Sequence, residues 1–130
     1  MDYIYKLIAR GEWGAACQRG WLEGSAVDLR DGFIHFSAAD QVAETARRHF
    51  AQESDLLLVE VRSQDLGPAL RWEPSRGGAL FPHLYGHLST AVAHAVAALE
   101  RQSDGTLKIP ALPLGQGRDG TAAQDVQAPA

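Results

Sequence analysis

The chain has 130 residues, 45% of them hydrophobic and 22% charged, which suits a single globular domain whose core needs no disulfide or structural metal. Its formal net charge of −4 argues against a general nucleic-acid surface, because phosphate binding requires a concentrated basic face. A lone cysteine, the absence of a signal-peptide pattern and the absence of an apolar run near 20 residues predict a cytoplasmic protein without membrane contact, and leave its oligomeric state open.

The first third of the chain predicts a strand, a helix, a loop and a second strand. Residues 3–9 are rich in β-prone types, and 12–18 follow as a short helix that Gly20 ends. Residues 21–31 contain turn formers and read as a loop. The short apolar segment 33–36 reads as a strand that enters the core.

The middle of the chain predicts a second helix and a central strand. Ser37 is placed as a helix N-cap, with Asp40 three residues later in the manner of a capping box. The helix is expected over 38–52. The continuous apolar run 56–61 predicts a strand that is covered on both faces.

Strands are also expected in the last part of the domain. Residues 69–73 predict a strand, and 91–101 are compatible with a helix by alanine content or a strand by alternation; we choose the strand. The pattern over 103–109 resembles a turn and a returning strand. We therefore expect one domain over 1–114, followed by a disordered tail over 115–130, which has little to bury.

The segment 71–86 carries an unusual variety of chemical groups in sixteen positions. It holds a carboxylate, two guanidiniums, two prolines, three glycines and the side chains of Trp72, His83 and Tyr85. We interpret it as a rigid functional loop between strands, a usual place for a small-molecule site. The alternative is a structural corner in which Glu73 and Arg76 form an internal ion pair.

A second candidate site is the segment 31–37, Asp-Gly-Phe-Ile-His-Phe-Ser. In a strand, Phe33 and His35 share one face and Ile34 and Phe36 the other. His35 could hydrogen-bond a ligand hydroxyl, although a histidine among apolar neighbours is more often a satisfied core group. Its candidacy strengthens if it meets the segment 71–86 in space.

Generic motifs do not explain these segments. His83 and His87 are four residues apart, but Pro82 and Gly86 argue against the helix that would bring two metal ligands together, so we predict no metal site. The chain lacks dinucleotide, P-loop and serine-hydrolase signatures in the right context. It also lacks a thioredoxin-like redox motif that would support a glutathione transferase.

Several motifs together resemble a bacterial family, domain of unknown function 952. The resemblance runs from Tyr3 to about Pro113 and rests on Ile4-Tyr5-Lys6, Gly24-Ser25, Asp31-Gly32-Phe33-Ile34-His35-Phe36-Ser37, Thr45 through Phe50, Glu73-Pro74-Ser75-Arg76-Gly77-Gly78 and Phe81-Pro82-His83-Leu84-Tyr85-Gly86. It implies an ADP-ribosyltransferase-like α+β fold, with a bent, split, mostly antiparallel sheet, two short helices and an NAD-binding cleft.

The resemblance also implies roles for individual residues. His35 matches a first-motif histidine, and Glu73 is the best match for an acidic residue that stabilises the oxocarbenium-like sugar formed when nicotinamide leaves ribose. These two are the expected catalytic residues. The expected ligand-binding residues are Ser37, Trp72, Ser75, Arg76, Gly77, Gly78, His83 and Tyr85.

The implied ligand is NAD, ADP-ribose or a related phosphorylated molecule, with NAD as substrate and no cofactor required. A non-catalytic nucleotide or metabolite-binding module and a protein-interaction domain remain the alternatives. The catalytic hypothesis requires that His35, Glu73 and Arg76 line one shared, solvent-accessible hollow.

Overall fold

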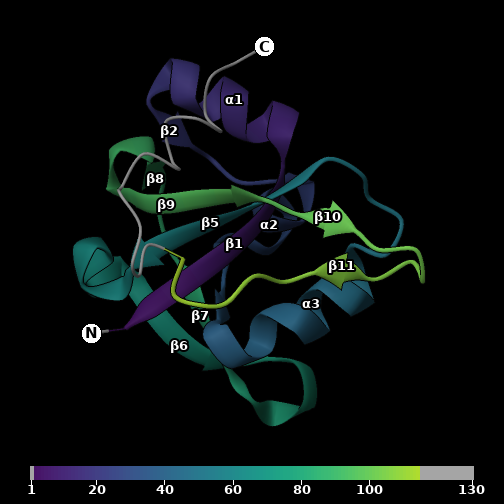
Figure 1. Ribbon diagram of the computed structural model, residues 1–130. Helices are drawn as coiled ribbons and strands as arrows, with labels where there is room; N and C mark the ends of the chain where they lie inside the picture. Colours follow the sequence, from purple (N-terminus) through teal and green to yellow (C-terminus); the bar gives the residue numbers. More distant parts are fainter. Residues whose placement is uncertain (1, 115–130) are drawn as a thin grey trace.

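A computed structural model describes residues 2–114, apart from the side chain of Arg76, and has a mixed α+β fold (Figure 1). Its helices are α1 (Arg10–Arg19), α2 (Ala26–Asp31) and α3 (Val42–His49), with single-turn or short 3-10 segments η1 (Ala39–Gln41), η2 (Ser63–Ala69), η3 (Arg76–Gly78) and η4 (Thr90–Val92). The strands are β1 (Tyr3–Ala9), β2 (Trp21–Leu22), β3 (Ile34–His35), β4 (Ser37–Ala38), β5 (Leu56–Arg62), β6 (Leu70–Pro74), β7 (Leu80–Leu84), β8 (Leu88–Ser89), β9 (Ala93–Ala98), β10 (Glu100–Arg101) and β11 (Leu107–Lys108). The tail predicted over 115–130 lies outside the described residues.

Two antiparallel sheets organise these elements. The larger has the strand order β4-β1-β5-β9 and the smaller the order β3-β7-β6, and two-strand ribbons pair β2 with β8 and β10 with β11. The chain passes from one sheet to the other at Phe36, whose N–H donates to the carbonyl of Pro82 over 3.0 Å. The α+β class and its antiparallel character are therefore confirmed.

The larger sheet is covered on both faces. One core cluster packs the first face against α1 and the smaller sheet, and consists of Ile4, Ile8, Trp13, Ala16, Leu22, Ile34, Phe36, Leu57, Val59, Val61, Leu84, Leu88 and Val96. The second cluster packs the other face against α3 and the end of the described chain, and consists of Tyr5, Leu7, Val42, Ala46, Leu58, Ala95 and Leu114. In Figure 1, α1 and α3 lie on either side of the central strands. This two-sided burial explains the continuous apolar run in β5, as predicted.

The predicted loop over 21–31 is wrong at both ends, because Trp21–Leu22 form β2 and Ala26–Asp31 form α2. Ser25 is the N-cap, and its capping box with Asp28 was readable in the sequence as Ser-x-x-Asp. The structure thus contains three α-helices within residues 2–114 instead of the expected two. Gly32 ends α2 in the left-handed region, at a φ of 90°.

The capping role predicted for Ser37 is also wrong. Ser37 lies in β4, buried, and its hydroxyl donates to Oγ1 of Thr45 over 3.0 Å. The turn before α3 begins after Ala38, whose N–H donates to the side chain of Gln41. Ser37 is consequently used to hold α3 against the sheet.

The segment 71–86 is a β-hairpin for most of its length. Strands β6 and β7 pair from Leu70 with Leu84 to Pro74 with Leu80, and only the turn between them is irregular. The strand chosen over 91–101 is confirmed by β9, and the hairpin expected over 103–109 is confirmed by the pairing of β10 with β11. No helix within residues 2–114 is long and apolar enough to cross a membrane.

A buried carboxylate lies at the centre of the larger sheet. Glu60 is fully buried, and its Oε2 accepts hydrogen bonds from the Tyr5 hydroxyl over 2.8 Å and from the N–H of Leu114. Burial, together with the hydrogen bond to Glu60, raises the pKa of Tyr5, so its hydroxyl remains a donor at ordinary pH. This contact fastens the end of the described chain to the sheet.

Replacing Tyr5 with Phe should lower the free energy of unfolding by about 1–3 kcal/mol, because it removes a donor to a buried carboxylate. Tyr85→Phe is the matched control, since Tyr85 also donates to a glutamate over 2.8 Å but at an exposed position. Urea unfolding of both variants should give the larger loss for Tyr5→Phe. Equal losses would show that the burial of Glu60 does not control the cost.

Candidate functional site

The smaller sheet has one face toward the core and one outward face rich in polar and aromatic groups. Ile34 pairs with Leu84, and both belong to the core, whereas His35 pairs with His83 on the opposite face. Arg71 on β6 is also opposite His83. We call this outward surface the site face, and define it by Phe33, His35, Arg71, Glu73, His83 and Tyr85.

His35 is held by a carboxylate from the helix that precedes its strand. Its backbone N–H donates to Oδ1 of Asp28 over 3.1 Å, and its ring Nδ1 lies 2.6 Å from the same oxygen. The turn at Gly32 brings the end of α2 back toward β3, which allows this contact. The His35 side chain keeps 33% of its surface exposed, so it is both anchored and accessible.

Asp28 is almost fully buried and has further donors. Its Oδ2 accepts from Nζ of the buried Lys6 over 2.8 Å and from the N–H of Ser25 over 2.9 Å. Burial opposes its ionisation, but hydrogen bonds from His35 and Lys6 and the charge of Lys6 outweigh it and hold the pKa of Asp28 well below its usual range. Asp28 is therefore a buried anion whose two carboxylate oxygens both accept hydrogen bonds from donors of the same chain.

The second ring nitrogen of His35 faces another acid. Nε2 lies 3.0 Å from Oδ2 of Asp31, at the end of α2. Asp31 also accepts a hydrogen bond from Nε of Arg30 over 3.0 Å, and this bond lowers the pKa of Asp31. The His35 ring thus lies between a buried and a half-buried carboxylate.

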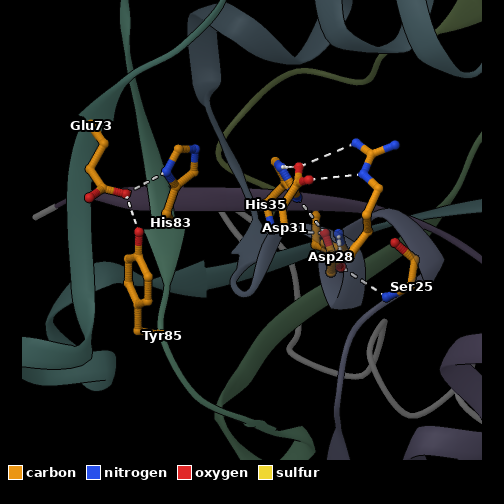
Figure 2. Close-up of polar contacts among 9 residues, drawn as sticks. Ser25, Asp28, Asp31, His35, Glu73, His83 and Tyr85 are labelled. Carbon is orange, nitrogen blue, oxygen red and sulfur yellow. Dashed lines mark hydrogen bonds and ion pairs between the residues drawn. The ribbon is translucent and has the colours of Figure 1, made fainter.

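Glu73 is the centre of a second imidazole–carboxylate pair. Its Oε1 accepts from the Tyr85 hydroxyl over 2.8 Å and lies 2.8 Å from Nδ1 of His83 (Figure 2). These two bonds lower the pKa of Glu73, which is therefore ionised at neutral pH, and the hydrogen bond to Glu73 raises the pKa of Tyr85. The guanidinium of Arg71 lies over the Tyr85 ring, 5.1 Å from its centroid.

The ring of Phe33 connects the two pairs. It stacks on His83 with centroids 4.0 Å apart and an interplanar angle of 24°, and its centroid lies 4.7 Å from that of His35 and 5.3 Å from that of Tyr85. The His35 and His83 rings meet edge to face at 5.5 Å. Figure 2 shows the two pairs side by side, with Glu73, His83 and Tyr85 on one side and His35, Asp31 and Asp28 on the other.

The structure brings together four of the residues predicted for the site: His35, Glu73, His83 and Tyr85. Their roles toward a ligand stay predictions. The proposed internal pair of Glu73 with Arg76 and the required hollow with His35 both depend on the Arg76 side chain, which lies outside the described part of the structure.

The other predicted ligand contacts lie elsewhere. Ser37 is buried against α3. Trp72 alternates with Arg71 and Glu73, so it points to the other side of the hairpin, where 43% of it is exposed. Ser75, Gly77 and Gly78 form the exposed turn after β6, in which Gly77 and Gly78 have φ values of 69° and 84°.

Sequence reasoning missed the residues that hold His35. A lysine at position 6, inside an otherwise apolar strand, signals a buried partner, since lysine is rarely buried unless it is paired. The capping-box spacing signalled that a helix begins after Ser25, with Asp28 in its first turn. Arg71 and Asp31 carried no signal beyond their place in the two segments already singled out.

Within residues 2–114, no group of three or more histidine, cysteine, aspartate or glutamate side chains is arranged to hold a metal ion. The carboxylates of Asp28, Asp31 and Glu73 instead contact imidazole, ammonium, guanidinium and phenol groups of the same chain. Chemically, the face offers the ionised carboxylate of Glu73, the partly exposed imidazole of His35 and partly exposed aromatic rings, whereas the imidazole of His83 is buried.

Comparison with known proteins identifies the family. The model described as "Protein of unknown function (DUF952)" matches residues 7–96, and the chain belongs to this family. It is 48% identical to protein CC0527 from Caulobacter crescentus in an X-ray crystal structure, with a TM-score of 0.79 over 82% of this chain and 93% of that chain. A solution NMR structure of CC0527 gives 49% identity and a TM-score of 0.74 over 82% and 91%. No curated protein matches the chain.

Gly24→Ala should destabilise the protein and disturb Asp28. A Cβ at Gly24 would lie 2.7 Å from Cβ of Asp28, and the φ of +128° is unfavourable for alanine. We expect a loss of about 2 kcal/mol or more in denaturant unfolding. Gly14→Ala is the control: its Cβ meets nothing within 4 Å, and alanine favours the helix, so a small gain is expected.

Asp28 should make the protein sensitive to acid. Because its pKa is lowered on folding, its contribution is complete above the ordinary aspartate pKa of about 4 and is lost as the pH falls toward the lower folded value. Asp28→Asn should lower the free energy of unfolding by about 3 kcal/mol at neutral pH. The free energy of unfolding of this variant should then decline less steeply below pH 5 than that of the wild-type protein. Unfolding curves from pH 7 to 2, with the exposed Asp65→Asn as control, test this; an unchanged slope in Asp28→Asn would contradict it.

Proposed function

We propose that the site face binds NAD or a related ADP-ribose ligand, and that Glu73 and His35 act on its nicotinamide–ribose bond. The reaction class comes from the resemblance of the motifs around these residues to the ADP-ribosyltransferase fold. The observation that carries the proposal is the position of the ionised Glu73 and the anchored His35 on one face, within a shared cluster of rings.

Glu73 is suited to electrostatic stabilisation. When the C1′–N bond breaks, its electron pair passes to the nicotinamide nitrogen and the ribose becomes cationic; an oxygen nucleophile then bonds to C1′ and loses its proton to solvent. A carboxylate held in place stabilises the cationic sugar more than the intact substrate. The bonds from His83 and Tyr85 both use Oε1, so they hold Glu73 as an anion and fix its orientation.

His35 and the rings are suited to binding. In this proposal, Nε2 of His35 hydrogen-bonds a ribose hydroxyl, and Phe33 and Tyr85 provide aromatic surface for the nicotinamide ring. Asp31 and Glu73, each with about a third of its side chain exposed at 30% and 32%, favour a positively charged pyridinium. Ser75, Gly77 and Gly78, which follow Glu73 closely in the chain, stay proposed contacts for the phosphates.

A protein-interaction domain is the second candidate. Trp72 and Leu80 lie on the same side of the β6–β7 hairpin, opposite the site face, and are 43% and 51% exposed. Aromatic residues presented in this way are common anchors in protein interfaces. A non-catalytic binding module would use the site face without breaking a bond.

Thermal unfolding with NAD, ADP-ribose, AMP and inorganic phosphate separates these functions. A ligand that binds the native state at about ten times its Kd contributes about 1.4 kcal/mol and should raise Tm by roughly 5 °C or more. We expect the rise with NAD or ADP-ribose and not with phosphate alone. A flat response to every nucleotide at millimolar concentration would contradict both the catalytic and the binding function.

Nicotinamide release from NAD tests catalysis directly. Glu73→Gln should reduce release by about 100-fold or more, because it removes the charge that stabilises the transition state, and should retain the NAD-induced rise in Tm. Glu12→Gln, an exposed change on α1, is the control and should leave release unchanged. Binding without release in the wild-type protein would assign the non-catalytic function.

A further inference from the structure

We infer that Asp28 is the positioning residue for His35: it fixes the proton on Nδ1 and makes Nε2 the nitrogen that meets the ligand. The inference deepens the proposed function and rests on it for the identity of the ligand. Its evidence, the contacts of Asp28 with His35 and Lys6, is independent of any ligand.

One carboxylate oxygen holds His35 at two points. Oδ1 of Asp28 accepts from the backbone N–H of His35 and lies 2.6 Å from the ring Nδ1, so both the main chain and the ring have fixed orientations relative to α2. An ionised carboxylate is only an acceptor, and therefore the proton of this bond belongs to Nδ1. In a neutral ring Nε2 then carries the lone pair, and in a protonated ring it is a donor.

The contact with Asp31 shows that Nε2 is the ring nitrogen on the exposed side. Oδ2 of Asp31 lies 3.0 Å from Nε2, a contact that is favourable only when Nε2 also carries a proton. Asp31 has 30% of its side chain exposed, in contrast to the fully enclosed Asp28. A ligand hydroxyl that takes the place of Asp31 can donate to Nε2 when the ring is neutral. It can accept from Nε2 when the ring is protonated.

Lys6 makes the arrangement possible. It is 4% exposed, comes from β1 in the larger sheet, and balances the charge of Asp28 through a 2.8 Å contact. Without this cation, the whole negative charge of Asp28 would act on His35. Removing Lys6 and removing the charge of Asp28 should therefore move the protonation of His35 in opposite directions, which a general loss of stability would not do.

Other charged groups near His35 are unchanged in Asp28→Asn and Lys6→Met. Asp31 and its partner Arg30 belong to α2, and the ring of His83 on β7 is 5.5 Å away and paired with Glu73 on β6. Because all of them lie near the His35 ring, the test compares titration midpoints between variants and does not rely on a single midpoint.

The test is NMR of protein labelled with nitrogen-15 in histidine, titrated without ligand, with His35 assigned by its loss in His35→Gln. In the wild-type protein, the neutral His35 ring should carry its proton on Nδ1. Asp28→Asn should lower the titration midpoint by about one pH unit or more, and Lys6→Met should raise it. Asp31→Asn, the matched control on the same ring, should lower the midpoint and leave the proton of the neutral ring on Nδ1.

His94, which lies on the larger sheet, should titrate alike in all variants and serves as an internal reference. A neutral wild-type ring protonated on Nε2 would overturn the inference, as would shifts of the same sign in Asp28→Asn and Lys6→Met. If Asp28→Asn does not fold, the inference is still tested by the position of the proton on the wild-type ring and by the midpoint shifts in Lys6→Met and Asp31→Asn. The NMR experiment contains no ligand. If it gives the expected result while no nucleotide raises Tm, the proposed function is contradicted and the positioning role of Asp28 is not.

Discussion

The buried ion pair of Lys6 with Asp28 is the interaction on which the arrangement of the site face depends. It joins β1 of the larger sheet to α2, and the same carboxylate joins α2 to β3 of the smaller sheet. Burying two charges carries a large desolvation cost, which is offset only when the geometry is good and the remaining hydrogen bonds are made. Asp28 meets this condition, since its carboxylate accepts hydrogen bonds from Lys6, Ser25 and His35.

This constraint explains why a six-residue helix is stable here. A helix as short as α2 has little stability of its own, because nucleation costs more than its few hydrogen bonds return. The capping box of Ser25 and Asp28 begins it, and Gly32 ends it. The acid that caps the helix also anchors the histidine, so the stability of α2 and the orientation of His35 have one cause.

The sequence was sufficient for elements whose pattern is local. The bounds of β1 agree with the predicted strand over 3–9, and the apolar run over 56–61 identified the central β5, because burial on both faces leaves a direct mark on composition. The faces of Phe33 and His35 followed from alternation alone. The failures at α2 and Ser37 arose where several local patterns compete, since serine, aspartate and glycine favour caps and turns alike.

The contacts within the site could not be predicted in the same way. Glu73 meets His83 because the β6–β7 hairpin has a particular register, and a shift of one residue would turn one of them toward the core. The meeting of His35 with His83 depends further on β3 joining that hairpin. Sequence could identify the segments and their chemical groups, but the partners depend on pairings between distant strands.

The distribution of charge on the site face narrows the kind of ligand it suits. Asp28 is neutralised by Lys6 and enclosed, so the accessible carboxylates are those of Asp31 and Glu73, while Arg71 lies against the ring of Tyr85. The ionised Glu73, and to a lesser degree Asp31, whose charge is partly balanced by Arg30, would attract a planar cation beside the aromatic rings and repel a free phosphate. In the proposed function, a phosphate-bearing ligand would therefore bind with its cationic or sugar end on the site face and its phosphates beyond it, an orientation that would place a ribose bond, and not a phosphoanhydride, beside Glu73.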